Sequence, residues 1–237
     1  MKNKQRIMAG LVKGMTGSAL MMISDWLMGA CGKDNVTNGV VQSNWAKAAA
    51  WRYEAAMLIA SIAIFFLFAG MKEMIHLMKL SRNKRDPWSL RIVRAFELGA
   101  TATIVSELFL HMKGCVLPIL YRKLYATSLM ESDMLTVVDD VFFYISIPFY
   151  IFSVLVVVCT SVPYIYQIIQ GRLRVPKWFL LLNPLVFWLF GWVLRLFKVS
   201  VITDFTACMI SFGFLMMAWG FLQHVIRTPE ASRERAE

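Results

Sequence analysis

The sequence predicts an all-α protein: a polytopic membrane helical bundle with six transmembrane helices, built as a single domain over residues 1–237. The chain is 58% hydrophobic and only 17% charged, which is less charge than soluble domains usually carry. Six apolar stretches each reach the length of about 20 residues that a helix needs to cross a bilayer. Only short loops and tails remain, so no separate soluble domain is expected. The six stretches are residues 8–30, 54–76, 92–112, 141–165, 178–197 and 203–225.

The distribution of Lys and Arg orients this bundle. If the chain changes sides after each stretch, 17 of its 25 basic residues lie on the side of the two termini. Cytoplasmic loops carry the excess of basic residues, so both termini are predicted to be cytoplasmic. The net charge of +10 follows from this excess, and Arg82, Lys84 and Arg85 suit anionic lipid headgroups. The expected partner is therefore the lipid bilayer, and nucleic acid is not expected as a partner.

The first stretch has a start that also describes a secretory signal peptide, because Lys2, Lys4 and Arg6 precede the apolar run. The core of a signal peptide avoids charged residues. This stretch contains Lys13 and Asp25, so it is predicted to remain as a membrane helix.

Asp25 is the first candidate functional residue. At 100° per residue it shares a helix face with Gly10, Gly14 and Ser18, and small residues at this spacing mark a close helix contact. Asp25 is therefore predicted to point into the bundle. The alternative is an interfacial aspartate beside Trp26.

The third stretch carries the second candidate group, Glu107 and His111, which are separated by four residues and share a face with Thr103. A carboxylate beside an imidazole suits acid–base chemistry, proton relay or metal ligation. It equally suits a buried ion pair that positions a helix. The other two histidines, His76 and His224, fall at the predicted cytoplasmic ends, so no metal site is predicted.

Three further charged residues complete the predicted outer pocket. Asp139 and Asp140 open the fourth stretch, and solvated end charges favoured by the helix dipole are the alternative for them. Arg195 closes the fifth stretch and would neutralise Asp25 or Glu107 if it points inward. Its alternative is to snorkel to the interface. The full set of pocket candidates is Asp25, Glu107, His111, Arg195, Asp139 and Asp140.

Prolines and cysteines add weaker signals. Pro148 and Pro184 are expected to bend the fourth and fifth stretches, which leaves room for a ligand, although membrane helices tolerate proline without one. Four cysteines show no metal-binding spacing. Cys31 and Cys115 fall on the predicted outer side, where a disulfide is possible in an oxidising compartment; two unrelated small apolar residues are the alternative. No cofactor is identifiable.

Short motifs in the first, third and fifth stretches resemble an uncharacterised bacterial family of six-helix integral membrane proteins. The resemblance implies a bacterial cytoplasmic membrane location and brings no known reaction. It rests on Ser24-Asp25-Trp26-Leu27-Met28-Gly29, on the late His111, and on Pro176-Lys177-Trp178-Phe179 followed by Asn183-Pro184-Leu185.

Three functions remain open from the sequence. A polar pocket open to one side favours binding or transport of a small molecule or lipid. An intramembrane lipid-modifying enzyme would use Glu107 and His111 as an acid–base pair, with Asp25 as orienting residue or metal ligand. A structural or assembly protein would use the same charges as interhelical pairs.

Overall fold

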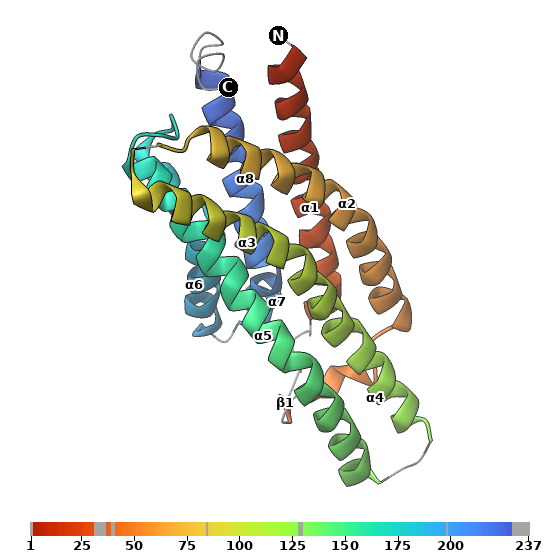
Figure 1. Ribbon diagram of the computed structural model, residues 1–237. Helices are drawn as coiled ribbons and strands as arrows, with labels where there is room; N and C mark the ends of the chain where they lie inside the picture. Colours follow the sequence, from red (N-terminus) through yellow and green to blue (C-terminus); the bar gives the residue numbers. More distant parts are fainter. Residues whose placement is uncertain are drawn as a thin grey trace.

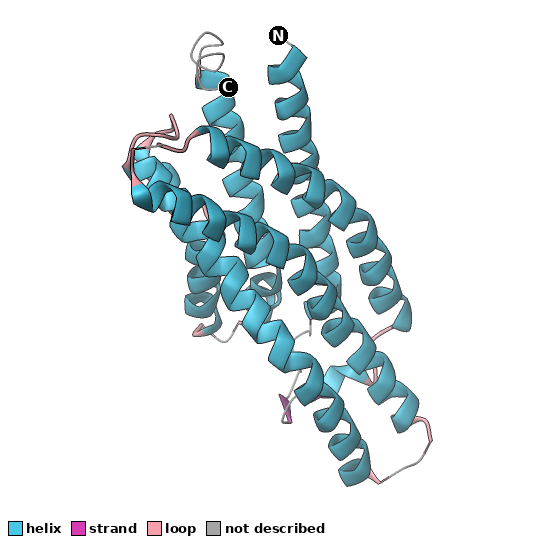
Figure 2. Ribbon diagram, viewed as in Figure 1, coloured by secondary structure: helices cyan, strands magenta, loops and turns pink. Residues whose placement is uncertain are grey.

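The computed structural model describes residues 2–30, 37–38, 41–83, 85–127, 130–197 and 199–228. These residues form a bundle of long helices, with one two-residue pair of antiparallel strands after the first helix (Figures 1 and 2). The elements are α1 (Lys2–Gly29), β1 (Thr37–Asn38), β2 (Val41–Gln42), η1 (Ser43–Trp45), α2 (Ala50–Leu80), α3 (Pro87–His111), η2 (Met112–Val116), α4 (Leu117–Tyr125), α5 (Glu131–Ile169), η3 (Lys177–Leu181), α6 (Pro184–Arg195), α7 (Ser200–Phe205), η4 (Thr206–Cys208) and α8 (Met209–Arg227).

Five helical segments in the described part of the chain are long and apolar enough to cross a membrane. They indicate a membrane protein, and the start of α1 and the end of α8 lie at the same end of the bundle (Figure 1). The predicted fifth span, 178–197, is instead divided into η3 and the 12-residue α6. Asn183 causes the division: its side chain accepts a hydrogen bond from the backbone N–H of Val186, and Pro184 occupies the first helical turn, so a new helix begins there.

The third and fourth spans are longer than predicted. The helical segment Pro87–Tyr125 has 39 residues and continues through η2, a π-helical turn, while α5 also has 39 residues. Such a helix measures about 58 Å, against about 30 Å for a bilayer core. Both helices therefore project beyond the others at the end opposite the termini (Figure 1). Trp45, Tyr121 and Val138 are buried together in this projection.

The helices α1 and α2 pack closely because both carry glycine at their crossing. A Cβ atom on Gly14 would lie 2.6 Å from the Cα of Gly70, and one on Gly17 would meet the backbone of Leu67. Such spacing leaves no room for a side chain on either helix. The small-residue face of α1 thus packs against α2.

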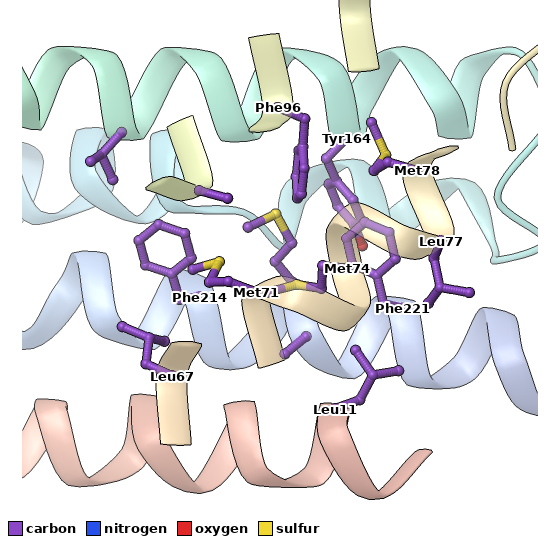
Figure 3. Packing of buried hydrophobic residues seen from close by; sticks show 14 of the residues in the cluster. Leu11, Leu67, Met71, Met74, Leu77, Met78, Phe96, Tyr164, Phe214 and Phe221 are labelled. Carbon is purple, nitrogen blue, oxygen red and sulfur yellow. The ribbon is translucent and has the colours of Figure 1, made fainter. Parts of the chain in front are cut away.

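A hydrophobic core fills the half of the bundle nearer the termini. Phe96 of α3 contacts Phe221 of α8 edge to face at 5.8 Å between ring centroids, and Tyr164 of α5 packs on the same ring at 5.5 Å. Met71 and Met74 of α2 reach toward these rings (Figure 3). The core thereby connects α2, α3, α5 and α8 through apolar contacts.

A polar network ties the start of α3 to the end of α5, at the end of the bundle that holds the termini. Asp86 Oδ2 accepts hydrogen bonds from Arg172 Nη2 and from the Tyr166 hydroxyl, both at 2.8 Å. Asp86 Oδ1 accepts from the Trp88 backbone N–H at 3.0 Å, which caps α3. The hydrogen bond from Arg172, followed by that from Tyr166, lowers the pKa of the Asp86 carboxyl.

This lowered pKa predicts an acid-sensitive contribution to stability. Because the folded-state pKa of Asp86 is depressed, its contribution is present above about pH 4 and is lost as pH falls through the folded-state pKa. We expect Asp86→Asn, which still caps the helix, to lower the thermal unfolding midpoint in detergent at pH 6. The difference from wild type should shrink toward pH 2.5. A constant difference across this range would contradict the prediction.

Candidate functional site

Four helices meet around a cluster of ionisable side chains at the end of the hydrophobic core. Asp25 lies late in α1, and Glu107 and His111 lie late in α3. Their exposed fractions are 1%, 5% and 4%. Ser24 of α1 and Ser211 of α8 are also buried here. The structure therefore brings Asp25, Glu107 and His111 together from two helices, α1 and α3, that are far apart in sequence, and we call these three the acid–histidine cluster.

Neighbouring groups hold each member of the acid–histidine cluster in place. The Ser211 hydroxyl donates to Asp25 Oδ2 at 2.5 Å. His111 Nδ1 lies 2.8 Å from the backbone carbonyl oxygen of Glu107; a carbonyl only accepts, so Nδ1 carries the hydrogen. His111 Nε2 lies 2.8 Å from the Ser24 hydroxyl, which donates to the Ala56 carbonyl at 2.6 Å. These contacts fix the imidazole with Nε2 toward α1.

The remaining carboxylate oxygens are buried and unsatisfied. Asp25 Oδ1 and Glu107 Oε2 have no hydrogen-bond partner within the described part of the chain. The first lies 3.7 Å from His111 Nε2, and the second lies 3.9 Å from His111 Nδ1. Burying an ionised carboxylate is costly unless it is paired and hydrogen-bonded. Two buried carboxylates beside one imidazole would therefore be stabilised by a bound proton or cation.

One ligand atom from each of Asp25, Glu107 and His111 lies within 4.8 Å of the other two, which is compatible with a shared cation. The π-helical turn η2 begins directly after His111, and such turns are frequent at functional sites. Cys115 of this turn is buried against Tyr53 and Ala56. Cys31, with which a disulfide was one of two possibilities, lies outside the described residues, so both possibilities stay open.

The other three candidate residues lie apart from the acid–histidine cluster. Arg195 donates from Nε to the Thr206 hydroxyl at 2.9 Å, and its guanidinium stacks on Trp192 at 5.4 Å. Within the described residues it forms no ion pair with Asp25 or Glu107. Asp139 and Asp140 are exposed on the projecting part of α5. Contacts of the cluster with Ser24 and Ser211 were not predicted. Ser24 stood out only as part of the motif Ser24–Gly29, and Ser211 only as a small polar residue within an apolar helix.

A hollow of ≈ 400 Å³ lies at the same end of the bundle as the acid–histidine cluster. Arg52 lines it and also donates from Nη2 to the carbonyl oxygens of Leu27 and Ala30, at 2.8 Å and 2.7 Å, which satisfies the last turn of α1. We call this space the outer hollow, because it lies on the side that the charge distribution predicts to be the outer one. Its lining residues are Trp26, Ala30, Asn44, Lys47, Ala48, Arg52 and Asp204.

The long apolar helices and the buried cluster together define a helical membrane protein with a polar centre. The sequence profile of a family of unknown function, DUF6796, matches residues 1–228. The chain therefore belongs to this family, which confirms the expected membership in an uncharacterised family. No curated protein and no solved structure matches the chain.

Proposed function

We propose that this protein is a multi-pass protein of a bacterial cytoplasmic membrane that binds or transports a small molecule or lipid from its outer side. The outer hollow is the observation that carries this proposal. Two residues that line the hollow are Trp26, which directly follows Asp25 in α1, and Ala30, which directly follows the end of α1. Arg52 of α2 lies one turn before Ala56. One turn is about 5.4 Å, so the hollow lies close to the acid–histidine cluster.

The lining of the outer hollow favours an amphipathic ligand with a zwitterionic head. Lys47 and Arg52 supply positive charge, Asp204 supplies negative charge, and Trp26 offers an aromatic face that is 49% exposed. Tryptophan is typical of the membrane interface, where headgroups lie. A zwitterionic phospholipid headgroup has the matching phosphate and ammonium groups.

Binding measurements on the purified protein test this proposal. We expect phosphatidylethanolamine, added to delipidated protein in detergent, to raise the unfolding midpoint. The double variant Trp26→Ala and Lys47→Gln should weaken this binding at least about tenfold. Lys123→Gln, an exposed lysine on α4, is the matched control for the lysine change. Unchanged affinity in the double variant, or no binding by wild type, would overturn the proposal.

Six crossings with cytoplasmic termini form part of the same proposal, with α6 completing the fifth passage. The charge distribution supports this orientation. In a cysteine-free background, Lys47→Cys should react with a membrane-impermeant thiol reagent on intact cells. Arg82→Cys should react only after permeabilisation. The reverse pattern would invert the topology.

An intramembrane enzyme acting on lipid is the second candidate. The unpartnered Glu107 Oε2 beside the His111 ring favours it, because an acid–base pair needs one free oxygen to exchange a proton. Comparison of lipid profiles between a deletion strain and an overproducing strain tests this activity. Identical profiles would argue against the enzyme. A purely structural role for the cluster is tested by the His111 variant described in the Discussion.

A further inference from the structure

We propose that Asp25, Glu107 and His111 bind a divalent transition-metal ion, of which Zn²⁺ is the best-matched example. This site is the acid–histidine cluster itself and needs no ligand in the outer hollow, so it extends beyond the binding function proposed above. Its donors are one imidazole nitrogen and two carboxylate oxygens.

Two of the three proposed ligand atoms, the carboxylate oxygens, have no hydrogen-bond partner among the described residues. Asp25 Oδ1 and Glu107 Oε2 are more than nine-tenths buried and have no hydrogen-bond partner in the described part of the chain. His111 Nε2 contacts the Ser24 hydroxyl and faces Asp25 Oδ1 at 3.7 Å. A tetrahedral ion about 2.1 Å from each ligand sets ligand atoms roughly 3.4 Å apart. Side-chain rotations that bring the three ligand atoms from within 4.8 Å of one another to this spacing would close the site.

The surrounding hydrogen bonds have the pattern found around metal ligands. A ligating histidine usually donates its other ring N–H to a carbonyl or carboxylate, and ligating carboxylates accept further hydrogen bonds. His111 Nδ1 donates to the Glu107 backbone carbonyl, and Asp25 Oδ2 accepts from Ser211. Both ligands are thus oriented through their outer atoms. Asp25 Oδ1 has no hydrogen-bond partner among the described residues, and a metal at His111 Nε2 would replace the contact of that nitrogen with the Ser24 hydroxyl.

Charge and donor type select the class of ion. A divalent cation balances the charge of two ionised carboxylates. If His111 were only protonated, its single positive charge would leave a net negative charge buried in the cluster. The imidazole favours Zn²⁺ and other first-row metals over Mg²⁺ and Ca²⁺, which prefer oxygen ligands. Three protein ligands leave a fourth position for water or another small ligand, as in catalytic rather than structural zinc sites.

Metal analysis of the full-length protein tests the site. The protein is purified with an affinity tag that contains no histidine, stripped with chelator, and titrated with Zn²⁺ in detergent. We expect one Zn²⁺ per chain by elemental analysis after gel filtration, and a higher unfolding midpoint. His111→Gln and Glu107→Gln should each weaken Zn²⁺ binding more than about 100-fold, and Ser211→Ala, which leaves all three ligands, by about 10- to 100-fold.

His76→Gln provides the matched control, because His76 lies on α2 near Arg6, Lys72 and Glu73, away from the cluster. This variant should bind Zn²⁺ as wild type does. Failure of wild type to retain Zn²⁺, or equal loss in His76→Gln and His111→Gln, would overturn the metal site. Lipid binding measured on the chelator-treated protein separates this outcome from failure of the outer hollow, since the hollow contains none of the three ligands.

Discussion

Replacing Gly14 with alanine is expected to force α1 away from α2 and to reduce the free energy of unfolding by about 3 kcal/mol, the upper end of the range for overpacking. The new Cβ would lie 2.6 Å from the Cα of Gly70. That atom belongs to a helix backbone and cannot rotate aside, so the helices themselves must separate. Because α1 also packs on α8, the separation should loosen the packing around Asp25.

Gly10→Ala is the matched control for this experiment. It makes the same chemical change on the same helix, but its Cβ would meet the Cγ of Glu73, an atom of a flexible side chain that can move. Alanine is favoured over glycine in a helix by about 1 kcal/mol, so Gly10→Ala should be neutral or slightly stabilising. Unfolding in detergent followed by circular dichroism compares the two. Equal stability of both variants would contradict the close crossing of α1 and α2.

Replacing His111 with leucine should destabilise the metal-free protein by about 3–5 kcal/mol, the range measured when one partner of a buried charge pair is removed. The change leaves Asp25 and Glu107 together in a buried place without the imidazole. It also removes the hydrogen bond that Ser24 shares with the ring. Equilibrium unfolding in the presence of chelator measures the loss.

Neutralising the carboxylates should then restore stability. We expect Asp25→Asn and Glu107→Gln, added to His111→Leu, to recover most of the loss, because the unpaired charges are gone. His76→Leu controls for the loss of any histidine. A His111→Leu protein no less stable than His76→Leu would show that the imidazole does not compensate the carboxylates.

The acid–histidine cluster was predictable in part because its members occupy defined helix faces. Asp25 lies on the small-residue face of α1, and Glu107 and His111 lie one turn apart on α3. Helical angle alone predicts which residues point inward. It does not predict which inward residues meet, since that depends on how α1, α3 and α8 are placed. Ser211 and the separate position of Arg195 could not be foreseen for this reason.

The helix ends were harder to predict than the helices. The third span was expected to end at residue 112. The helical segment instead continues to Tyr125. In this continuation the Lys113 ammonium lies over the rings of Phe142 and Phe149 of α5, each at 4.6 Å, a cation–π contact that the local sequence does not predict. By contrast, Asn183-Pro184 was a local signal for a helix start inside the fifth span.

The short α6 makes the apolar surface of the bundle shorter on its flank than along the neighbouring α5. Its 12 residues span about 18 Å, yet its surface is strongly apolar, with Phe190, Trp192 and Val193 each about half exposed. Beside it stands α5, more than three times as long. We expect lipid chains next to α6 to shorten or tilt to match it, and the bilayer to become thinner along this flank of the protein.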